Sequence, residues 1–165
     1  MKHVIFMAGL LALAAGCGTA EAPCTKQVPQ SKIDLVDQTQ LQADIVALDA
    51  YLDSKAIVAV KDPSGVRYVI TKAGDDTRPC LQSTVTVKYA GRLMNGTGFD
   101  AGVNPTSFTL GNLVLGWQFA FLNFGKGTKA TLYIPSGYGY GPAGSGTRIP
   151  PNSNLIFDIE LITFI

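Results

Sequence analysis

Histidine is almost missing from this chain of 165 residues, whose single imidazole is His3 near the N-terminus. If the first residues are removed as an export leader, as argued below, the mature protein has no histidine. Its absence excludes Ser-His-Asp and Cys-His catalysis and any histidine-ligated metal in the mature chain. We therefore expect a function that needs neither a metal nor a cofactor.

Charged residues are also few, at 15% of the chain, with 13 Lys and Arg against 12 Asp and Glu. Removal of Lys2 with the leader brings this balance to zero. Binding of nucleic acid relies on clustered basic side chains, so we expect no nucleic-acid partner. A hydrophobic content of 47% over this length is enough for one compact domain with a modest appendage.

The N-terminus has the pattern of an export signal. In "MKHVIFMAGLLALAAGC", Lys2 precedes an apolar run that is too short to span a bilayer. The ending "LAAGC" resembles the lipobox of bacterial lipoproteins. It predicts a signal peptide over residues 1–16 and lipidation of Cys17, with anchoring in the outer membrane facing the periplasm. The alternative is an ordinary secretory leader cleaved near "GTAEA".

Two cysteines remain once Cys17 carries a lipid. In an oxidising compartment, Cys24 and Cys80 form an even pair, which favours a disulfide, and the alternative is two buried free thiols. Residues 17–30 are rich in Ala, Pro, Thr and Gln and are predicted to be a lipid-anchored tether.

Residues 31–65 are predicted to form a helical appendage. Thr39 and Gln42 fit a capping box that begins an amphipathic helix ending near Lys55. The apolar residues Leu41, Ile45, Leu48 and Leu52 fall on one helical face. Packing of this face onto the body of the protein is favoured over a role in binding a partner.

From residue 66 onward the pattern changes to period two. Strands are expected around Val66 to Ile70 and Val85 to Tyr89, in a short segment with Phe108 and Leu110, and in "KATLYI" and "NLIFDIELITFI". "WQFAFLNFG" is the other helical candidate. This order predicts an α+β domain over residues 66–165, in which one short helix covers a face of an antiparallel sheet.

The stretch "SGYGYGPAGSGTRIPP" contains a formal G-x-G-x-x-G match at Gly139, Gly141 and Gly144. A phosphate loop needs a helix directly after its glycines, because the helix N-terminus binds the anion. Pro142 and further loop formers follow here instead. The match therefore does not indicate phosphate binding.

The order of several motifs resembles the FKBP-type peptidyl-prolyl cis-trans isomerase domain. These motifs are "VKYAG", "GFD", "LVLGWQFAFLNFGKGTKATLYIPSGYGYG" and "IPPNSNLIFDIEL", and the motif-bearing core covers residues 80–165. The resemblance implies a curved antiparallel β-sheet wrapped around one short α-helix. It also implies an aromatic pocket that receives a proline ring.

The resemblance assigns roles to nine residues. Trp117 would form the pocket floor, the Tyr140 hydroxyl and the Val114 backbone N-H would donate to substrate carbonyls, and Asp100 would be a polar group at the rim. An Asp100 carboxylate bonded to loop backbone or to Tyr140 is the alternative. The substrate-binding residues implied are Tyr89, Phe99, Leu113, Val114, Ile149 and Phe157.

Some positions depart from the family pattern. The loop after Asp100 is short, Thr106 replaces an aromatic residue, Asn112 replaces an acid, and Ser145 and Arg148 replace a histidine and an isoleucine. These changes concern the rim more than the floor of the pocket. They bear on substrate preference, macrolide affinity and catalytic efficiency, and proline binding is still expected.

The functional expectation is a monomeric prolyl isomerase for extracytoplasmic proteins, with proline-containing polypeptides and macrolide immunosuppressants as ligands. Two alternatives stay open at the level of sequence. One is a chaperone-like module that binds proline segments without turnover, and the other is a purely structural envelope lipoprotein.

Overall fold

The computed structural model describes residues 23–165. The predicted signal peptide at 1–16 and the predicted lipidation of Cys17 lie outside the described residues. Across residues 23–165, no helix is both long and apolar enough to cross a membrane. Within the same range, no three acidic, histidine or cysteine side chains gather closely enough to hold a metal ion.

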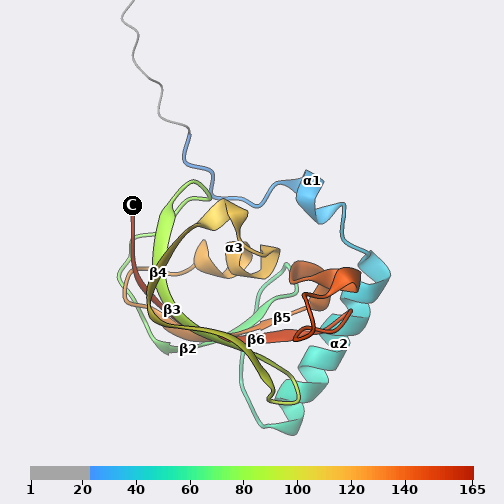
Figure 1. Ribbon diagram of the computed structural model, residues 1–165. Helices are drawn as coiled ribbons and strands as arrows, with labels where there is room; N and C mark the ends of the chain where they lie inside the picture. The colour runs from blue at the N-terminus through green and yellow to red at the C-terminus, as the bar shows by residue number, and fades with distance from the viewer. Residues whose placement is uncertain (1–22) are drawn as a thin grey trace, which may run out of the picture.

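The body of the protein is a curved, fully antiparallel six-stranded sheet, with the strands in the order β1-β2-β5-β6-β3-β4 (Figure 1). Its strands are β1 (Val60–Lys61), β2 (Arg67–Lys72), β3 (Thr84–Leu93), β4 (Gly98–Thr109), β5 (Lys129–Ile134) and β6 (Leu155–Phe164). The sheet begins before residue 66, because β1 pairs with β2 through Val60 and Tyr68.

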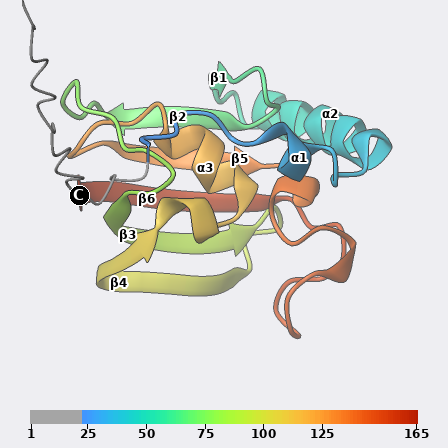
Figure 2. The same cartoon turned by 90° about the horizontal axis from the view of Figure 1, so that it is seen from above.

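The concave face of the sheet surrounds the short helix α3 (Leu115–Phe121), as Figures 1 and 2 show. Alternate residues of β5 and β6 point towards α3 and join the main core, among them Leu132, Ile134, Leu155 and Phe157. Trp117, Phe121 and Phe124 contribute aromatic bulk from the helix side. The expected α+β architecture, a curved antiparallel sheet around one short helix, is confirmed.

Strand β4 is longer than the sequence indicated. Asp100 lies within the strand rather than before a loop, and β4 continues to Thr109. Its pairing with β3 shifts between Gly102 and Thr106, where extra residues bulge out of the ladder. The expected strand at Phe108 and Leu110 is therefore the end of β4, and Leu110 begins the 3-10 turn η1 (Leu110–Asn112).

The appendage contains a one-turn helix, α1 (Gln30–Ile33), and the long helix α2 (Gln38–Ser54). The predicted capping box of Thr39 and Gln42 is wrong, because Asp37 and not Thr39 is the N-cap. The Asp37 carboxylate accepts hydrogen bonds from the backbone N-H groups of Thr39 and Gln40 at 2.9 and 3.1 Å. The helix ends one residue before Lys55, as the sequence suggested.

Helix α2 packs against the sheet through an outer cluster, which consists of the buried residues Leu48, Leu52, Tyr133 and Ile156. Tyr133 and Ile156 alternate along β5 and β6 with the residues that face α3, so they lie on the opposite face of the sheet. Leu41, near the start of α2, joins the main core. The predicted packing of this helix onto the body is what the structure shows.

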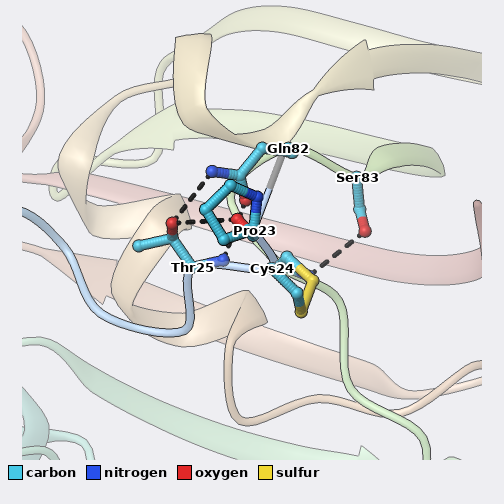
Figure 3. Close-up of a disulfide and its surroundings, with 6 residues drawn as sticks. Pro23, Cys24, Thr25, Gln82 and Ser83 are labelled. Atoms are coloured by element: carbon cyan, nitrogen blue, oxygen red, sulfur yellow. Dashed lines mark hydrogen bonds between the residues drawn. A yellow bond between two sulfur atoms is a disulfide. The ribbon is translucent and has the colours of Figure 1, made fainter. Parts of the chain in front are cut away.

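Residues 24–28 also lie against the body, although the sequence suggested a tether. Cys24 and Cys80 form a disulfide in the structure, with a Cα to Cα distance of 5.2 Å (Figure 3). Beside it, the Thr25 N-H donates to Gln82 Oε1 at 3.0 Å, and the Leu81 N-H donates to the Thr25 carbonyl at 2.9 Å. Residues 24 and 25, which precede the appendage, are therefore joined to the segment that leads into β3.

Candidate functional site

A cavity of about 260 Å³ opens between the concave face of the sheet and the start of α3. Trp117, in the first turn of α3, is only 4% exposed, and its Nε1 has no hydrogen-bond partner among the described residues. The other lining residues come from β3, β4, β6, the segment before α3 and the loop after β5: Tyr89, Asp100, Phe108, Asn112, Leu113, Val114, Tyr140 and Phe157. Most of the lining is aromatic or aliphatic.

The aromatic rings hold one another edge to face around the cavity. The Trp117 ring centroid lies 5.5 Å from that of Tyr89 and 5.3 Å from that of Phe157, with interplanar angles of 82° and 89°. Behind Trp117, the Phe121 ring stacks at 5.0 Å. Such edge-to-face pairs are favourable, and they fix the ring planes that border the cavity. A flat apolar ring of small size fits this enclosure.

Close approach of backbone to these rings requires glycine at two positions. A Cβ atom on Gly102 would lie 2.5 Å from the Tyr89 ring, and one on Gly91 would lie 2.5 Å from the Phe99 ring. Both distances are far below van der Waals contact, so any side chain there would displace an aromatic residue. The strands β3 and β4 thus make room for the rings by omitting side chains beside them.

Polar groups gather at the mouth of the cavity. The Tyr89 hydroxyl donates to Asp100 Oδ2 at 2.9 Å, and the Ala101 N-H donates to Asp100 Oδ1 at 2.9 Å. Burial raises the pKa of Tyr89, and the bond to Asp100 raises it further. Burial also raises the pKa of Tyr140, with the Asp100 charge as a second cause. Both hydroxyls therefore remain protonated donors across the physiological range.

Tyr140 is available to a ligand because it is 40% exposed and its hydroxyl has no partner among residues 23–165. The loop that carries it begins with the 3-10 turn η2 (Ser136–Tyr138). Tyr138 is buried, and its ring lies 5.0 Å from that of Phe119 in α3. Tyr138 thus anchors the loop, while Tyr140, two residues later, faces the cavity.

A buried carboxylate from the appendage holds the start of this loop. Asp44 of α2 is 4% exposed, and its Oδ2 accepts hydrogen bonds from the Ser136 N-H at 2.9 Å and the Ser136 hydroxyl at 2.5 Å. Gln40 donates to the other carboxylate oxygen at 2.8 Å. Helix α2 therefore contacts the loop that leads to Tyr140 through a polar network as well as through apolar packing.

Seven of the nine residues implied by the sequence line the cavity: Tyr89, Asp100, Leu113, Val114, Trp117, Tyr140 and Phe157. Phe99 and Ile149 do not line it. Phe99 supports Phe157 from behind, with ring centroids 5.4 Å apart, and Ile149 is buried in the main core. No described residue accepts a hydrogen bond from the Val114 backbone N-H, which leaves it free to donate. Asp100 accepts hydrogen bonds from the Tyr89 hydroxyl and from the backbone N-H of Ala101 in β4, and it has no bond to Tyr140.

Sequence reasoning missed Phe108 as a lining residue. Thr106, where the family has an aromatic residue, is exposed and bonds to the Asn104 carbonyl at 3.2 Å. Phe108 lies two positions further along β4, and its ring is 6.2 Å from that of Tyr89. The period of two in a strand was the available signal, because residues 106 and 108 share a face. Asn112, identified only as a departure, also lines the cavity.

The flap, residues 141–152, follows Tyr140 and projects from the body (Figure 2). It contains only the short 3-10 turn η3 (Gly141–Ala143). The α-helix that a phosphate-binding loop needs after its glycines is therefore missing from the flap. Ser145 and Ile149 exchange two backbone hydrogen bonds of 2.8 and 3.1 Å, which close the tip into a tight hairpin. Arg148 is exposed on this hairpin.

Three characterised or curated proteins are similar to about 60% of this chain. The chain is 41% identical over 102 residues to the probable FKBP-type peptidyl-prolyl cis-trans isomerase FkpA of Neisseria meningitidis, covering 60% of this chain and 38% of that protein. It is 41% identical over 105 residues to FK506-binding protein 1 of Dictyostelium discoideum, covering 61% of this chain and 98% of that protein. Identity to the outer membrane protein MIP of Legionella longbeachae is 38% over 104 residues, covering 61% of this chain and 45% of that protein. The chain thus spans less than half the length of two of these three relatives.

The fold leads to the same family. A crystal structure of a peptidyl-prolyl cis-trans isomerase from Pseudomonas syringae aligns with a TM-score of 0.66 at 31% identity, covering 74% of this chain and 94% of that one. The family model of the FKBP-type peptidyl-prolyl cis-trans isomerases matches residues 75–162, which include every residue that lines the cavity. On these grounds, the chain belongs to the FKBP-type peptidyl-prolyl cis-trans isomerase family.

Proposed function

We propose that the protein accelerates cis-trans rotation about Xaa-Pro bonds of proteins outside the cytoplasm. The observation that carries this proposal is the aromatic cavity over Trp117, which has the size and polarity for a proline ring and has hydroxyl donors only at its mouth. Catalysis of this rotation needs no nucleophile, metal or titrating base.

The barrier to rotation of a peptide bond is about 18 to 20 kcal/mol, because twisting removes amide resonance. The twisted amide has a less polar carbonyl than the planar one. Transfer from water into a cavity walled by Tyr89, Trp117 and Phe157 therefore disfavours the planar state more than the twisted state. Every 1.4 kcal/mol or so of this difference gives a tenfold faster rotation.

The polar residues at the mouth orient the substrate. In the proposal, the free hydroxyl of Tyr140 and the free backbone N-H of Val114 donate to carbonyls on either side of the proline. The Asp100 carboxylate is held by Tyr89 and by the backbone of Ala101, so it presents a fixed negative charge at the rim. FK506 is expected to compete for the same cavity, since the Dictyostelium relative is named for binding it.

The proposal also includes the cellular location of the protein. We infer that residues 1–16 are an export signal and that a lipid on Cys17 anchors the protein in the outer membrane, facing the periplasm. The name of the Legionella relative, an outer membrane protein, supports this location. Mass analysis of the native N-terminus tests it, since cleavage before Cys17 with added acyl mass is expected. An unmodified Cys17 would refute the anchor.

The test of the activity follows exchange between cis and trans Xaa-Pro peptides by NMR, with purified protein lacking residues 1–22. Faster exchange at micromolar protein is expected. Trp117→Ala removes the floor and should abolish proline binding, whereas Tyr140→Phe should keep binding and lower the rate. If exchange is not accelerated for any Xaa although peptides bind, the protein is a binding module without turnover.

A further inference from the structure

A second and larger cavity, of about 570 Å³, adjoins the proline pocket along the β3–β4 hairpin. Much of its wall is backbone, because Gly91, Gly96 and Gly98 contribute no side chains to it. A Cβ atom added to Gly96 would meet nothing within 4 Å, and one on Gly98 would meet only the Gly91 carbonyl at 3.9 Å. This space is therefore open to a ligand side chain.

The two cavities meet at Asp100, which lines both. Phe99, beside it in β4, lines only the second cavity and lies behind Phe157, a wall of the first. Neighbouring residues of an extended chain are about 3.3 to 3.6 Å apart. A peptide whose proline ring lies over Trp117 would thus direct the side chain of the adjacent residue past Asp100 into the second cavity.

The second cavity carries charges of both signs, because the Asp100 carboxylate lines it together with two arginines. Two guanidinium groups line it, and that of Arg92 is paired with Asp158 on β6. Arg148 has no ion pair and no side-chain hydrogen bond within residues 23–165. Both oxygens of the Asp100 carboxylate already accept hydrogen bonds. Arg148 is the cation that remains for a ligand.

The position of Arg148 is fixed by its neighbour in the flap. Ile149 is 5% exposed, belongs to the main core and exchanges backbone hydrogen bonds with Ser145. The backbone of Arg148 is thereby held at the edge of the cavity, and only its side chain needs to be ordered by a ligand. Holding the backbone in advance reduces the entropy cost of forming an ion pair there.

We propose that the second cavity is a subsite for an acidic side chain on the residue that precedes proline, and that Arg148 determines this preference. The inference rests on the proposed isomerase function and specifies its substrates: chain segments in which Glu or Asp comes directly before proline.

The test compares kcat/KM for four peptides that differ only in the residue before proline: Glu, Gln, Leu and Lys. Glu is expected to exceed Lys by about threefold to fivefold at low salt, the effect of one partly exposed ion pair. The preference should shrink in 0.5 M NaCl, because salt screens such a pair. A further peptide with Glu after proline should show no such preference.

Variants assign the effect to this cavity. Arg148→Glu should reverse the order of Glu and Lys, and Arg148→Lys should restore most of the wild-type order. Lys55→Glu, which makes the same charge change at an exposed residue at the end of α2, should leave the preference unchanged. Gly98→Leu should fill the cavity and reduce turnover of all long side chains, while an Ala-Pro peptide is still turned over.

The outcomes separate the two proposals. If no peptide is accelerated, the proposed function fails. If Leu-Pro and Ala-Pro peptides are accelerated but Glu and Lys are turned over equally, the isomerase function stands and the subsite is refuted. A preference that survives Arg148→Glu, or that belongs to the residue after proline, also overturns the inference.

Discussion

Two helices pack on opposite faces of the same sheet in different ways. One is α3, within the matched region of residues 75–162, and the other is α2, in the appendage that precedes this region. On the concave face, the seven residues of α3 are too short to fill the curve of the sheet, and an aromatic cavity remains beside Trp117. On the other face, the seventeen residues of α2 close completely over Tyr133 and Ile156, with Leu48 fully buried between them. The first contact leaves room for a ligand, whereas the outer cluster is closed and stabilises the fold.

Removal of the disulfide is the largest expected change to the appendage. Cys24 and Cys80 are 56 residues apart in sequence. In the chain-entropy model, a disulfide that closes a loop of this length stabilises the folded state by about 4 kcal/mol. The variant Cys24→Ser with Cys80→Ser should lose that much unfolding free energy in urea. Proline-peptide affinity of the folded variant should not change, and a weaker affinity would show that the two regions are not separable.

Leu48→Ala tests the closed face directly. Leu48 is 0% exposed in the outer cluster, so its truncation leaves a void and should lower the unfolding free energy by about 3 kcal/mol. Val46→Ala on the same helix is the control, because Val46 is 68% exposed and its change should cost under about 0.5 kcal/mol. Equal losses in the two variants would contradict the closed packing.

Asp44→Ala tests the polar contact between the appendage and the loop that leads to Tyr140. The change leaves the buried Ser136 hydroxyl without its acceptor and should cost about 2 kcal/mol of unfolding free energy. Because Ser136 begins the loop that carries Tyr140, kcat should fall while KM changes little. Asp53→Ala, at an exposed position of α2, serves as the control. An unchanged kcat in Asp44→Ala would limit α2 to a stabilising role.

The smallest expected effect concerns pH. Burial raises the pKa of Tyr133 on the closed face, so the folded state keeps its proton when the unfolded state loses it. The stability this provides is present below about pH 10 and is lost as pH rises towards the folded pKa. At pH 10.5, the unfolding free energy of the wild type should have fallen further than that of Tyr133→Phe, each measured relative to its own value at pH 7. Identical pH slopes would contradict the role of Tyr133.

The elements of the body could be predicted because their signals are local. Period two marks the strands, and the motifs around Trp117 and Tyr140 identify the pocket by their order. The start of α2 could not be fixed, since Asp37 and Thr39 are both good caps two residues apart. The contact between Asp44 and Ser136 joins residues 92 apart and leaves no trace in either neighbourhood.

Most of the side chains that line the proline pocket were predicted, but Phe108 and the second cavity, bounded by glycines, were not. Phe108 was not predicted as a lining residue, although a strand places it on the same face as Thr106, where the aromatic residue of the family is missing. The cavity beside Arg148 could not be foreseen, because it is bounded by glycines of β3 and β4 whose proximity arises only when the hairpin pairs. The sequence could identify Arg148 as a departure but not the space beside it.

Gly102 illustrates how far the site depends on residues that never touch a ligand. A single added methyl group there would push the Tyr89 ring aside and carry the Asp100 hydrogen bond with it. Loss-of-function substitutions in this protein should therefore include positions outside the pocket lining, where an added side-chain atom would clash with a lining residue. A mutational scan of the rim should find Gly102 as intolerant as Trp117, although it contributes nothing to binding.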